Sequence, residues 1–180
     1  MHGELKYWMV KRKRLSGRAV RMKSFILDNV LVCADIGCGP RGGIFEQKTY
    51  PKMYGVDPLW QEYEKLNLDT AKDIVRITAT AENFVLPELA DLIVSFNAMD
   101  HSGNLSKGIE NIKLNLSPGG VFIMHMHLRT KKQLDNLHSI YYTLDSVKAH
   151  FDTYKLFDKD PIMGPKTKKK YKTFIGWLYA

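Results

Sequence analysis

The sequence is poor in cysteine and contains no long hydrophobic run. Its 180 residues include 2 cysteines, Cys33 and Cys38, which lie five positions apart and do not suit a disulfide framework. No apolar run approaches the roughly 18 residues that a bilayer-spanning helix needs. The first residues, MHGELKYWMVKRKR, lack an apolar segment followed by a small-residue cleavage site. These absences predict a cytoplasmic protein with reduced thiols.

Acidic residues are scarce at the two ends of the chain. Residues 1–25 hold eight Lys or Arg against one acid, and residues 165–172 hold five lysines and no acid, in a chain of net charge +8. Basic ends on a mildly acidic body could bind nucleic acid, acidic lipid or an anionic substrate. The alternative is a solvated helix face and a polar hairpin loop, which is the common role of such charge runs.

The chain also lacks internal repeats and low-complexity linkers. Hydrophobic residues make up 44% and charged residues 26%, which is typical of a globular domain. A chain of 180 residues suits one domain with a full core. We therefore treat residues 1–180 as a single domain.

Apolar runs alternate with helical patterns along this domain. We expect strands over residues 30–36, 53–56, 74–78, 91–96, 121–126, 153–157 and 173–179. We expect helices over residues 4–14, 18–27, 44–48, 106–116 and 134–151, the last with Thr143 as an internal cap. Strands that alternate with helices and end in a hairpin predict an α/β fold, a three-layer sandwich around a mostly parallel sheet.

The stretch Leu31–Gly43 reads LVCADIGCGPRGG, a pattern that predicts a buried strand followed by a glycine-rich turn. Its first residues are nearly all apolar, as in a strand buried on both faces of a parallel sheet. Gly37, Gly39 and Gly42 permit positive φ and let a ligand approach the bare backbone. This layout predicts a nucleotide-type cofactor site at the carboxyl end of the first strand.

The glycine spacing alone does not identify the cofactor, because it also matches the dinucleotide fingerprint. Asp57 lies 20 residues after Gly37, where a carboxylate accepts hydrogen bonds from a ribose diol. Asp35 separates the candidates, since a carboxylate at the strand end would repel a pyrophosphate but suits a ligand with an ammonium and a sulfonium group. A chain of this length also leaves no room for the substrate domain of most nicotinamide enzymes. These features favour S-adenosylmethionine.

Five motifs, in order along the chain, carry a resemblance to a known family. They are ADIGCGPRGG (34–43), YGVDPL (54–59), ITATAENF (77–84), ADLIVSFNAMDH (90–101) and LSPGGVFIMHMH (116–127). With them the chain resembles the class I S-adenosylmethionine-dependent methyltransferases of the small "type 11" kind. The resemblance implies a Rossmann-like α/β/α sandwich with a seven-stranded sheet, mostly parallel, whose last strand is antiparallel. It also implies S-adenosyl-L-methionine as the cofactor.

The resemblance further implies three parts within one methyltransferase domain. Residues 1–28 would form an N-terminal helical lid, and residues 29–127 would form the cofactor-binding core. Residues 128–180 would supply an acceptor-side helix and a C-terminal hairpin.

Ten cofactor-binding residues are implied, all near the carboxyl ends of the first four strands. They are Asp35, Gly37, Cys38, Gly39, Asp57, Pro58, Leu59, Ala81, Glu82 and Asn97. The residues after the first strand would surround the methionine portion. Asp57 would bind the ribose hydroxyls, one of the next two residues would face the adenine, and the pair after the third strand would flank it. Asn97 would lie near the amino-acid portion or the reactive methyl group.

Three of these residues also have ordinary structural interpretations. Asp57 precedes a proline, as turn-forming aspartates do. Glu82 could be a solvated acid in a loop, and Asn97 could be a turn residue at the end of a strand.

Candidate bases follow the fourth strand. Methyl transfer is an in-line displacement with an excellent leaving group, so the protein aligns the nucleophile and, for a hydroxyl acceptor, removes a proton. His101 is best placed for this, with Asp100 to hold or charge its imidazole. Some sugar and small-molecule members of the family resemble this chain in having Asn-x-x-Asp-His here. His138 is a second candidate; the alternatives are a helix-start acid with an exposed imidazole, and a core or surface position for His138.

The histidines of the fifth strand and the two cysteines raise two further possibilities, a metal site and a catalytic thiol. His125 and His127 share one face of the fifth strand and could bind a metal with His101. No carboxylate or cysteine has convincing ligand spacing, so we expect no metal. Cys33 and Cys38 have no base partner, so we expect no catalytic thiol.

Other functions remain beside methyl transfer to a small-molecule acceptor. An RNA-modifying methyltransferase could use the basic ends to bind phosphates. The chain has no Asn/Asp-Pro-Pro-Tyr/Phe motif after the fourth strand, which argues against exocyclic base amines but not against every RNA target. A non-catalytic module would bind S-adenosylmethionine without turnover. A nicotinamide oxidoreductase is disfavoured by Asp35. The sequence identifies neither the acceptor nor the oligomeric state.

Overall fold

The computed structural model describes residue 5 and residues 27–68, 73–136, 138, 140–158 and 172–180. The helices predicted over residues 4–14 and 18–27 lie outside these residues except for Leu5 and Leu27. Both basic ends, apart from Lys172, lie outside them as well.

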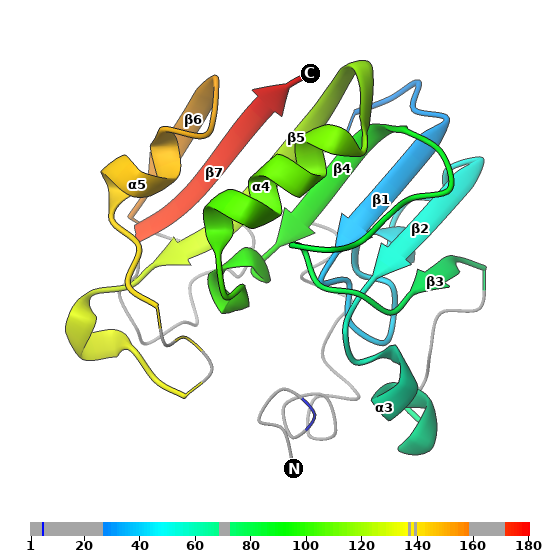
Figure 1. Cartoon of the computed structure of the whole chain (residues 1–180), viewed down its shortest axis with the longest axis horizontal. Helices are drawn as coiled ribbons and strands as arrows, with labels where there is room; N and C mark the ends of the chain where they lie inside the picture. Colours follow the sequence, from blue (N-terminus) through cyan, green and yellow to red (C-terminus); the bar gives the residue numbers. More distant parts are fainter. Residues whose placement is uncertain (1–4, 6–26, 69–72, 137, 139, 159–171) are drawn as a thin grey trace.

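One sheet of seven strands forms the centre of the described structure (Figure 1). Its strands are β1 (Val32–Ile36), β2 (Lys52–Val56), β3 (Val75–Ile77), β4 (Ala90–Phe96), β5 (Leu116–Leu128), β6 (Thr153–Phe157) and β7 (Lys172–Tyr179). They lie in the order β3-β2-β1-β4-β5-β7-β6. The pairs from β3 to β5 are parallel, and β7 is antiparallel to both of its neighbours. This confirms the predicted fold and the antiparallel last strand.

Side chains that alternate along the strands form two apolar layers, one on each face of the sheet. In β4, for example, Ile93 lies in one buried cluster and Leu92 and Val94 lie in the other. The first cluster includes Ile109 and Val147 from the helices that cover that face. The second includes aromatic side chains from the segments after β1 and β2. The sheet is therefore covered on both faces, as a three-layer sandwich requires.

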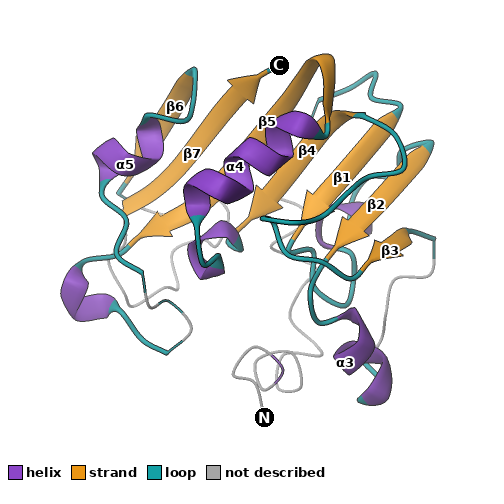
Figure 2. Ribbon diagram, viewed as in Figure 1, coloured by secondary structure: helices purple, strands orange, loops and turns teal. Residues whose placement is uncertain are grey.

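Short helices connect the strands (Figure 2). The α-helices are α3 (Trp60–Lys65), α4 (Leu105–Leu114) and α5 (Leu144–Lys148), and the 3-10 helices are η2 (Gly43–Glu46), η3 (Met99–His101) and η4 (Lys131–Gln133). The long helix predicted over residues 134–151 is wrong, because α5 is the only α-helix among the residues described in this range. Thr143, predicted as an internal cap, is instead the N-cap that begins α5 and accepts a hydrogen bond from the Ser146 N–H. Among the described helices, none is both long and apolar enough to cross a bilayer.

The chain reverses its direction of travel across the sheet between β1 and β4. From β1 it proceeds through β2 to the edge strand β3, then returns to β4 on the other side of β1. The carboxyl ends of β1 and β4 therefore adjoin at this reversal point, which is where open α/β sheets form their ligand-binding crevice.

Candidate functional site

The turn after β1 is built from glycines in the left-handed region. Gly37 has φ +72° and Gly39 has φ +68°. The Gly37 N–H donates to the Val56 carbonyl at 2.7 Å, which ties the turn to the end of β2. A Cβ on Gly37 would collide with the Cβ of Ala98 in the segment after β4. The absence of a side chain at position 37 thus lets the segments after β1 and β4 touch.

Asp35 lies at the end of β1 and holds the far side of this glycine loop. Its side chain is buried, and Oδ2 accepts a hydrogen bond from the Ile44 N–H at 2.8 Å. Gly43 approaches the same oxygen so closely that a Cβ there would collide with it. The carboxylate predicted to face the cofactor therefore also shapes the loop.

Asp57, after β2, binds the same loop from the other side. Its Oδ2 accepts from the Gly39 N–H at 2.9 Å, and its Oδ1 accepts from the Leu59 N–H at 2.9 Å. The second bond is the Asx turn expected of an aspartate before Pro58. Pro58 is exposed and Leu59 is half-buried just before α3.

Cys38 contributes its backbone to the loop but directs its side chain into the core. The thiol is buried in the second apolar cluster, against Gly55 of β2. Burial, followed by the charges of Asp57 and Asp35, raises the pKa of Cys38 well above its ordinary value. The side chain is therefore an uncharged thiol.

Ala81 and Glu82 lie beside the amino end of α4. Ala81 is buried, and its carbonyl accepts a hydrogen bond from the Asn111 side chain at 3.1 Å. A Glu82 carboxylate oxygen accepts from the Asn104 N–H at 3.1 Å. Burial raises the pKa of Glu82, but hydrogen bonds from Asn104, from Thr80 and from nearby backbone N–H groups outweigh it and keep the pKa below its ordinary value. Glu82 is thus an ionised acid tied to α4.

Asn97 ends β4 in a left-handed conformation, with φ +56°. Its N–H donates to the His125 carbonyl at 2.8 Å. Its side-chain Oδ1 is buried and has no hydrogen-bond partner in the described part of the chain. A buried amide oxygen without a donor is costly. Asn97 therefore suits a ligand that carries a donor such as an ammonium group, and the residues of this crevice fit S-adenosylmethionine.

Beyond Asn97, five polar side chains gather next to the carboxyl ends of β4 and β5. They are Asp100 and His101 of η3, Arg129 after β5, and Asp135 and His138 of the following turn. The Asp100 carboxylate is buried and is paired through Oδ2 with the Arg129 guanidinium. The His101 and His138 rings have their centroids 4.2 Å apart. The structure thus brings together all three predicted catalytic residues.

Sequence reasoning missed two members of this group, Arg129 and Asp135. Arg129 follows directly on β5, at the edge of the sheet where ligands bind, and this position was a readable signal. Asp135 falls within the stretch that was predicted as helix. In the structure it forms an isolated backbone bridge with His138 instead.

The two histidines of β5 are buried and pack against each other. The rings of His125 and His127 are 5.3 Å apart at their centroids, and His125 also packs against Phe96. Within the described residues, the cluster with metal-ligating geometry contains Asp100, His101 and His138, and neither histidine of β5. The trio weighed from the sequence, His125 and His127 with His101, is therefore not the arrangement that the structure brings together.

Comparisons with known proteins identify the family of this chain. A family model described as a methyltransferase domain matches residues 7–160. The chain belongs to this methyltransferase family. The class recognised from the sequence, an S-adenosylmethionine-dependent methyltransferase of class I, is confirmed, and S-adenosylmethionine is its cofactor.

Solved structures share the fold of this methyltransferase at low sequence identity. A possible histamine N-methyltransferase from Thermotoga maritima has a TM-score of 0.65 at 15% identity, over 96% of this chain and 93% of that one. The N-methyltransferase NodS from Bradyrhizobium japonicum, in complex with S-adenosylhomocysteine, has a TM-score of 0.66 at 13% identity, over 99% and 98%. An O-methyltransferase of a Brevibacillus brevis polyketide synthase has a TM-score of 0.60 at 17% identity, over 99% and 76%. A search of curated proteins returned no significant sequence match.

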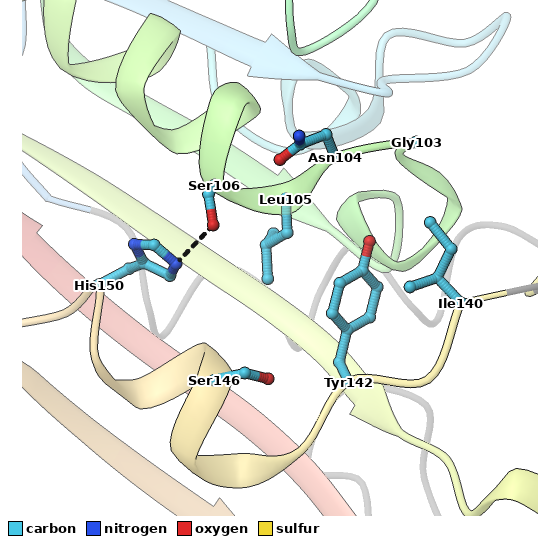
Figure 3. A pocket seen from close by; sticks show the side chains of 8 residues that line it. All are labelled: Gly103, Asn104, Leu105, Ser106, Ile140, Tyr142, Ser146 and His150. Carbon is cyan, nitrogen blue, oxygen red and sulfur yellow. Dashed lines mark hydrogen bonds between the residues drawn. The ribbon is translucent and has the colours of Figure 1, made fainter.

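A pocket of about 240 Å³ lies between the first turn of α4 and α5 in the methyltransferase (Figure 3). Ser106 and His150 face each other across it, with Oγ and Nε2 3.1 Å apart. Tyr142 lines it and donates to the Ser102 carbonyl at 3.2 Å, one residue after His101. The pocket is lined by none of the residues predicted to bind the cofactor or to act in catalysis.

Proposed function

We propose that this methyltransferase transfers a methyl group to an oxygen or nitrogen of a small-molecule acceptor, with His101 as the general base. The observation that carries the proposal is the position of the Asp100–His101 turn. It follows β4 directly, at the reversal point of the sheet, and places a partly exposed imidazole beside a buried carboxylate. His101 Nε2 lies 3.8 Å from Asp100 Oδ1.

The crevice residues keep the cofactor roles given above. Asp57 would bind the ribose hydroxyls, because carboxylate oxygens have capacity for further donors after one backbone hydrogen bond each. Asn97 Oδ1 would accept from the amino group of the methionine portion. The adenine would lie between Leu59 and the pair Ala81 and Glu82.

When bound, S-adenosylmethionine supplies an electrophilic methyl carbon and a sulfur atom that takes back the electron pair of the broken carbon–sulfur bond. The chain's own residues align the acceptor and take up its proton. His101 takes this proton from a hydroxyl or ammonium acceptor. With Nε2 facing Asp100, Nδ1 is the nitrogen that receives it. The Asp100 carboxylate then stabilises the imidazolium.

Solved structures with a similar fold support the proposed acceptor atoms. These proteins include a possible histamine N-methyltransferase from Thermotoga maritima, the N-methyltransferase NodS from Bradyrhizobium japonicum and an O-methyltransferase from Brevibacillus brevis. We propose, on the same division as above, that residues 1–28 cover the acceptor, that residues 29–127 bind the cofactor, and that residues 128–180 supply the acceptor-side wall.

Transfer of a labelled methyl group tests the proposal. The full chain is incubated with methyl-labelled S-adenosylmethionine and a panel of small hydroxyl and amine compounds, and label is expected in one class of acceptor. His101→Gln should lose at least about 100-fold in turnover, because an amide cannot take the proton. Its affinity for the cofactor should stay unchanged. Full turnover by this variant across about pH 6 to 9 would remove His101 from the mechanism.

A further inference from the structure

A line of hydrogen bonds connects Asp135 to the carboxylate beside the proposed base. Asp135 Oδ1 lies 2.7 Å from Nδ1 of His138, and the His138 N–H also donates to it at 3.0 Å. On the other side of the ring, Arg129 Nη2 lies 2.8 Å from His138 Nε2. The Nη1 of the same guanidinium donates to Asp100 Oδ2. Four side chains are thus joined in the order Asp135, His138, Arg129, Asp100.

This arrangement fixes the protonation of His138. A guanidinium has only donors, so His138 Nε2 must be the acceptor of the bond from Arg129. The remaining proton then lies on Nδ1, where the Asp135 carboxylate accepts it. Burial is the largest influence on the pKa of His138 and lowers it; Asp135 and Asp100 raise the pKa, the charges of His101 and Arg129 lower it, and the net shift is downward. His138 is therefore a neutral imidazole with one tautomer.

The side chains differ in how far an acceptor can reach them. The side chain of His101 is 26% exposed, whereas those of His138, Arg129 and Asp100 are 12%, 9% and 3% exposed. His138 also has both ring nitrogens engaged by neighbours, while His101 lies on the outer side of the pair. An acceptor therefore meets His101 first.

We propose that Asp135, His138 and Arg129 are positioning residues, which hold the Asp100 carboxylate against His101. This assignment rests on the proposed function, because it takes His101 as the base. His138 then acts as a neutral bracket between Asp135 and Arg129, and it does not exchange protons with the acceptor. Arg129 fixes one oxygen of Asp100, so that the other oxygen, Oδ1, is directed towards His101.

Arg129 bonds to two of the three side chains that could otherwise bind a metal ion. The ligand atoms of Asp100, His101 and His138 all lie within 4.8 Å of one another, as around a divalent cation. Arg129, however, bonds to both Asp100 and His138 from between them. Its guanidinium supplies the positive charge that a metal ion would bring. We therefore assign the group to positioning and make metal binding an outcome of the test.

Paired substitutions distinguish a positioning role from a second base. His138→Gln places an amide oxygen near the position of Nε2 and keeps an acceptor for Arg129, whereas His138→Ala does not. His138→Ala should lose at least roughly tenfold in turnover, since a hydrogen bond to a charged group is lost. His138→Gln should recover part of that loss, and its turnover should remain well above that of His101→Gln. The turnover of Asp135→Asn should likewise exceed that of Asp135→Ala, because the asparagine amide oxygen still accepts from the Nδ1–H of His138.

The tautomer of His138 gives a readout that does not require turnover. In ¹⁵N-histidine-labelled protein, long-range ¹H–¹⁵N correlation spectra should show His138 as the neutral Nδ1–H tautomer at neutral pH. Asp135→Ala should weaken this preference, because only the Arg129 donor to Nε2 then still selects the tautomer, and Asp135→Asn should retain it. Asp145→Ala is the matched control, because it removes an acid on α5 whose side chain is 83% exposed and touches none of these residues.

Three results would overturn the assignment. Equal losses in His138→Gln and His101→Gln would make His138 a base. An Nε2–H tautomer or an imidazolium at position 138 would remove the line of hydrogen bonds. If a chelator abolished turnover and zinc or manganese restored it, the group would be a metal site and Arg129 would not be its positive charge. Wild-type protein without methyl transfer would contradict the proposed function and the catalytic purpose of the network, while the tautomer spectrum would still decide whether the network exists.

Discussion

At the residue scale, Asp35 and Asp57 were predicted to bind the cofactor, and both also hold the glycine loop through hydrogen bonds. Asp35 accepts from the Ile44 N–H and Asp57 accepts from the Gly39 N–H, so the two carboxylates grip the loop from both sides. The sequence indicated both acids from their positions after strands. It could not show these contacts, because they depend on how the turn folds back on its own strand.

Asp57→Ala should weaken binding of S-adenosylmethionine by roughly 10- to 100-fold, the effect of losing hydrogen bonds to a charged acceptor. Isothermal titration calorimetry with S-adenosylmethionine and S-adenosylhomocysteine measures the change. Both ligands should be affected equally, because both carry the ribose. Glu110→Ala is the control, since it removes an exposed acid from α4. An Asp57→Ala protein with wild-type affinity would refute the ribose assignment.

Gly37→Ala and Gly119→Ala should destabilise the protein to different extents. Both glycines have positive φ, +72° and +79°, so each alanine carries a backbone cost of about 1–2 kcal/mol. A Cβ at position 37 also collides with Ala98, whereas one at position 119 meets nothing within 4 Å. The collision should add about 1–3 kcal/mol. Urea denaturation measures both variants, and equal losses would show that the segment after β4 yields freely.

At the element scale, strands were predicted better than helices. Most of the strands are short apolar runs bounded by turn signals. Each of the seven was expected within two residues of its observed bounds, except that β5 begins at Leu116 rather than at residue 121. The helix over residues 134–151 failed because apolar spacing around Tyr141 and Leu144 continued a periodicity that the backbone does not follow. Asp135 and His138 bond to each other in a turn, and Thr143 has extended angles, φ −82° and ψ 158°, that begin a new helix.

Helix α3 was not predicted at all, because it is short and follows a turn signal. It has 6 residues, of which Trp60 and Tyr63 are buried. Their spacing of three gives too few apolar positions to establish a helical period. The Trp60 indole donates to the Gly55 carbonyl at 2.9 Å, so tertiary contact with β2 holds this helix in place.

The N-caps of α4 and α5 should respond differently to alanine. Asn104 accepts from the Lys107 N–H and Thr143 accepts from the Ser146 N–H, so each substitution removes a cap that contributes about 1 kcal/mol. Helix α4 packs along the sheet, so Asn104→Ala should lower global stability by that amount. The 5-residue helix α5 should instead open locally.

Hydrogen exchange measures this difference. Amides of α5 should exchange faster in Thr143→Ala without a change in the strands, and Asn104→Ser should restore α4, because serine is a good N-cap. Faster exchange throughout the sheet in Thr143→Ala would contradict the local interpretation.

At the scale of the whole molecule, sequence motifs indicated the residues at the ends of β1, β2 and β4 more fully than the group around Asp100. The residues proposed to bind the cofactor follow strands at short sequence distances, so the motifs include them directly. Arg129 and Asp135 act through partners that are distant in sequence, since Arg129 pairs with a carboxylate 29 positions away. Pattern and spacing within one segment carry no information about such a pairing.

Stability of the whole protein should fall as the pH falls. The Val32 N–H, together with the Leu31 N–H, lowers the pKa of Asp91 below 3.8, and burial lowers the pKa of His138 below 6.5. A group whose pKa is lower in the folded protein stabilises above its ordinary pKa and loses that contribution as the pH falls through the folded value. The His138 contribution should decline below about pH 6.5 and that of Asp91 below about pH 4.

Urea midpoints recorded from about pH 8 down to about pH 3 test this expectation. Asp91→Asn should flatten the lower part of the profile, and His138→Gln should flatten the upper part. A wild-type midpoint that rises on acidification would have the wrong sign.

The hydrogen bonds that hold the glycine loop should affect the kinetics of cofactor binding. Its backbone N–H groups at Gly39 and Ile44 donate to Asp57 and Asp35 of the chain itself. No ordering of this loop then has to accompany association, so the observed rate should rise linearly with ligand concentration and show no plateau. The heat capacity change should be small and reflect only the apolar surface that the ligand covers. The chain's own carboxylates thus hold the loop, and its shape does not depend on contacts with the ligand.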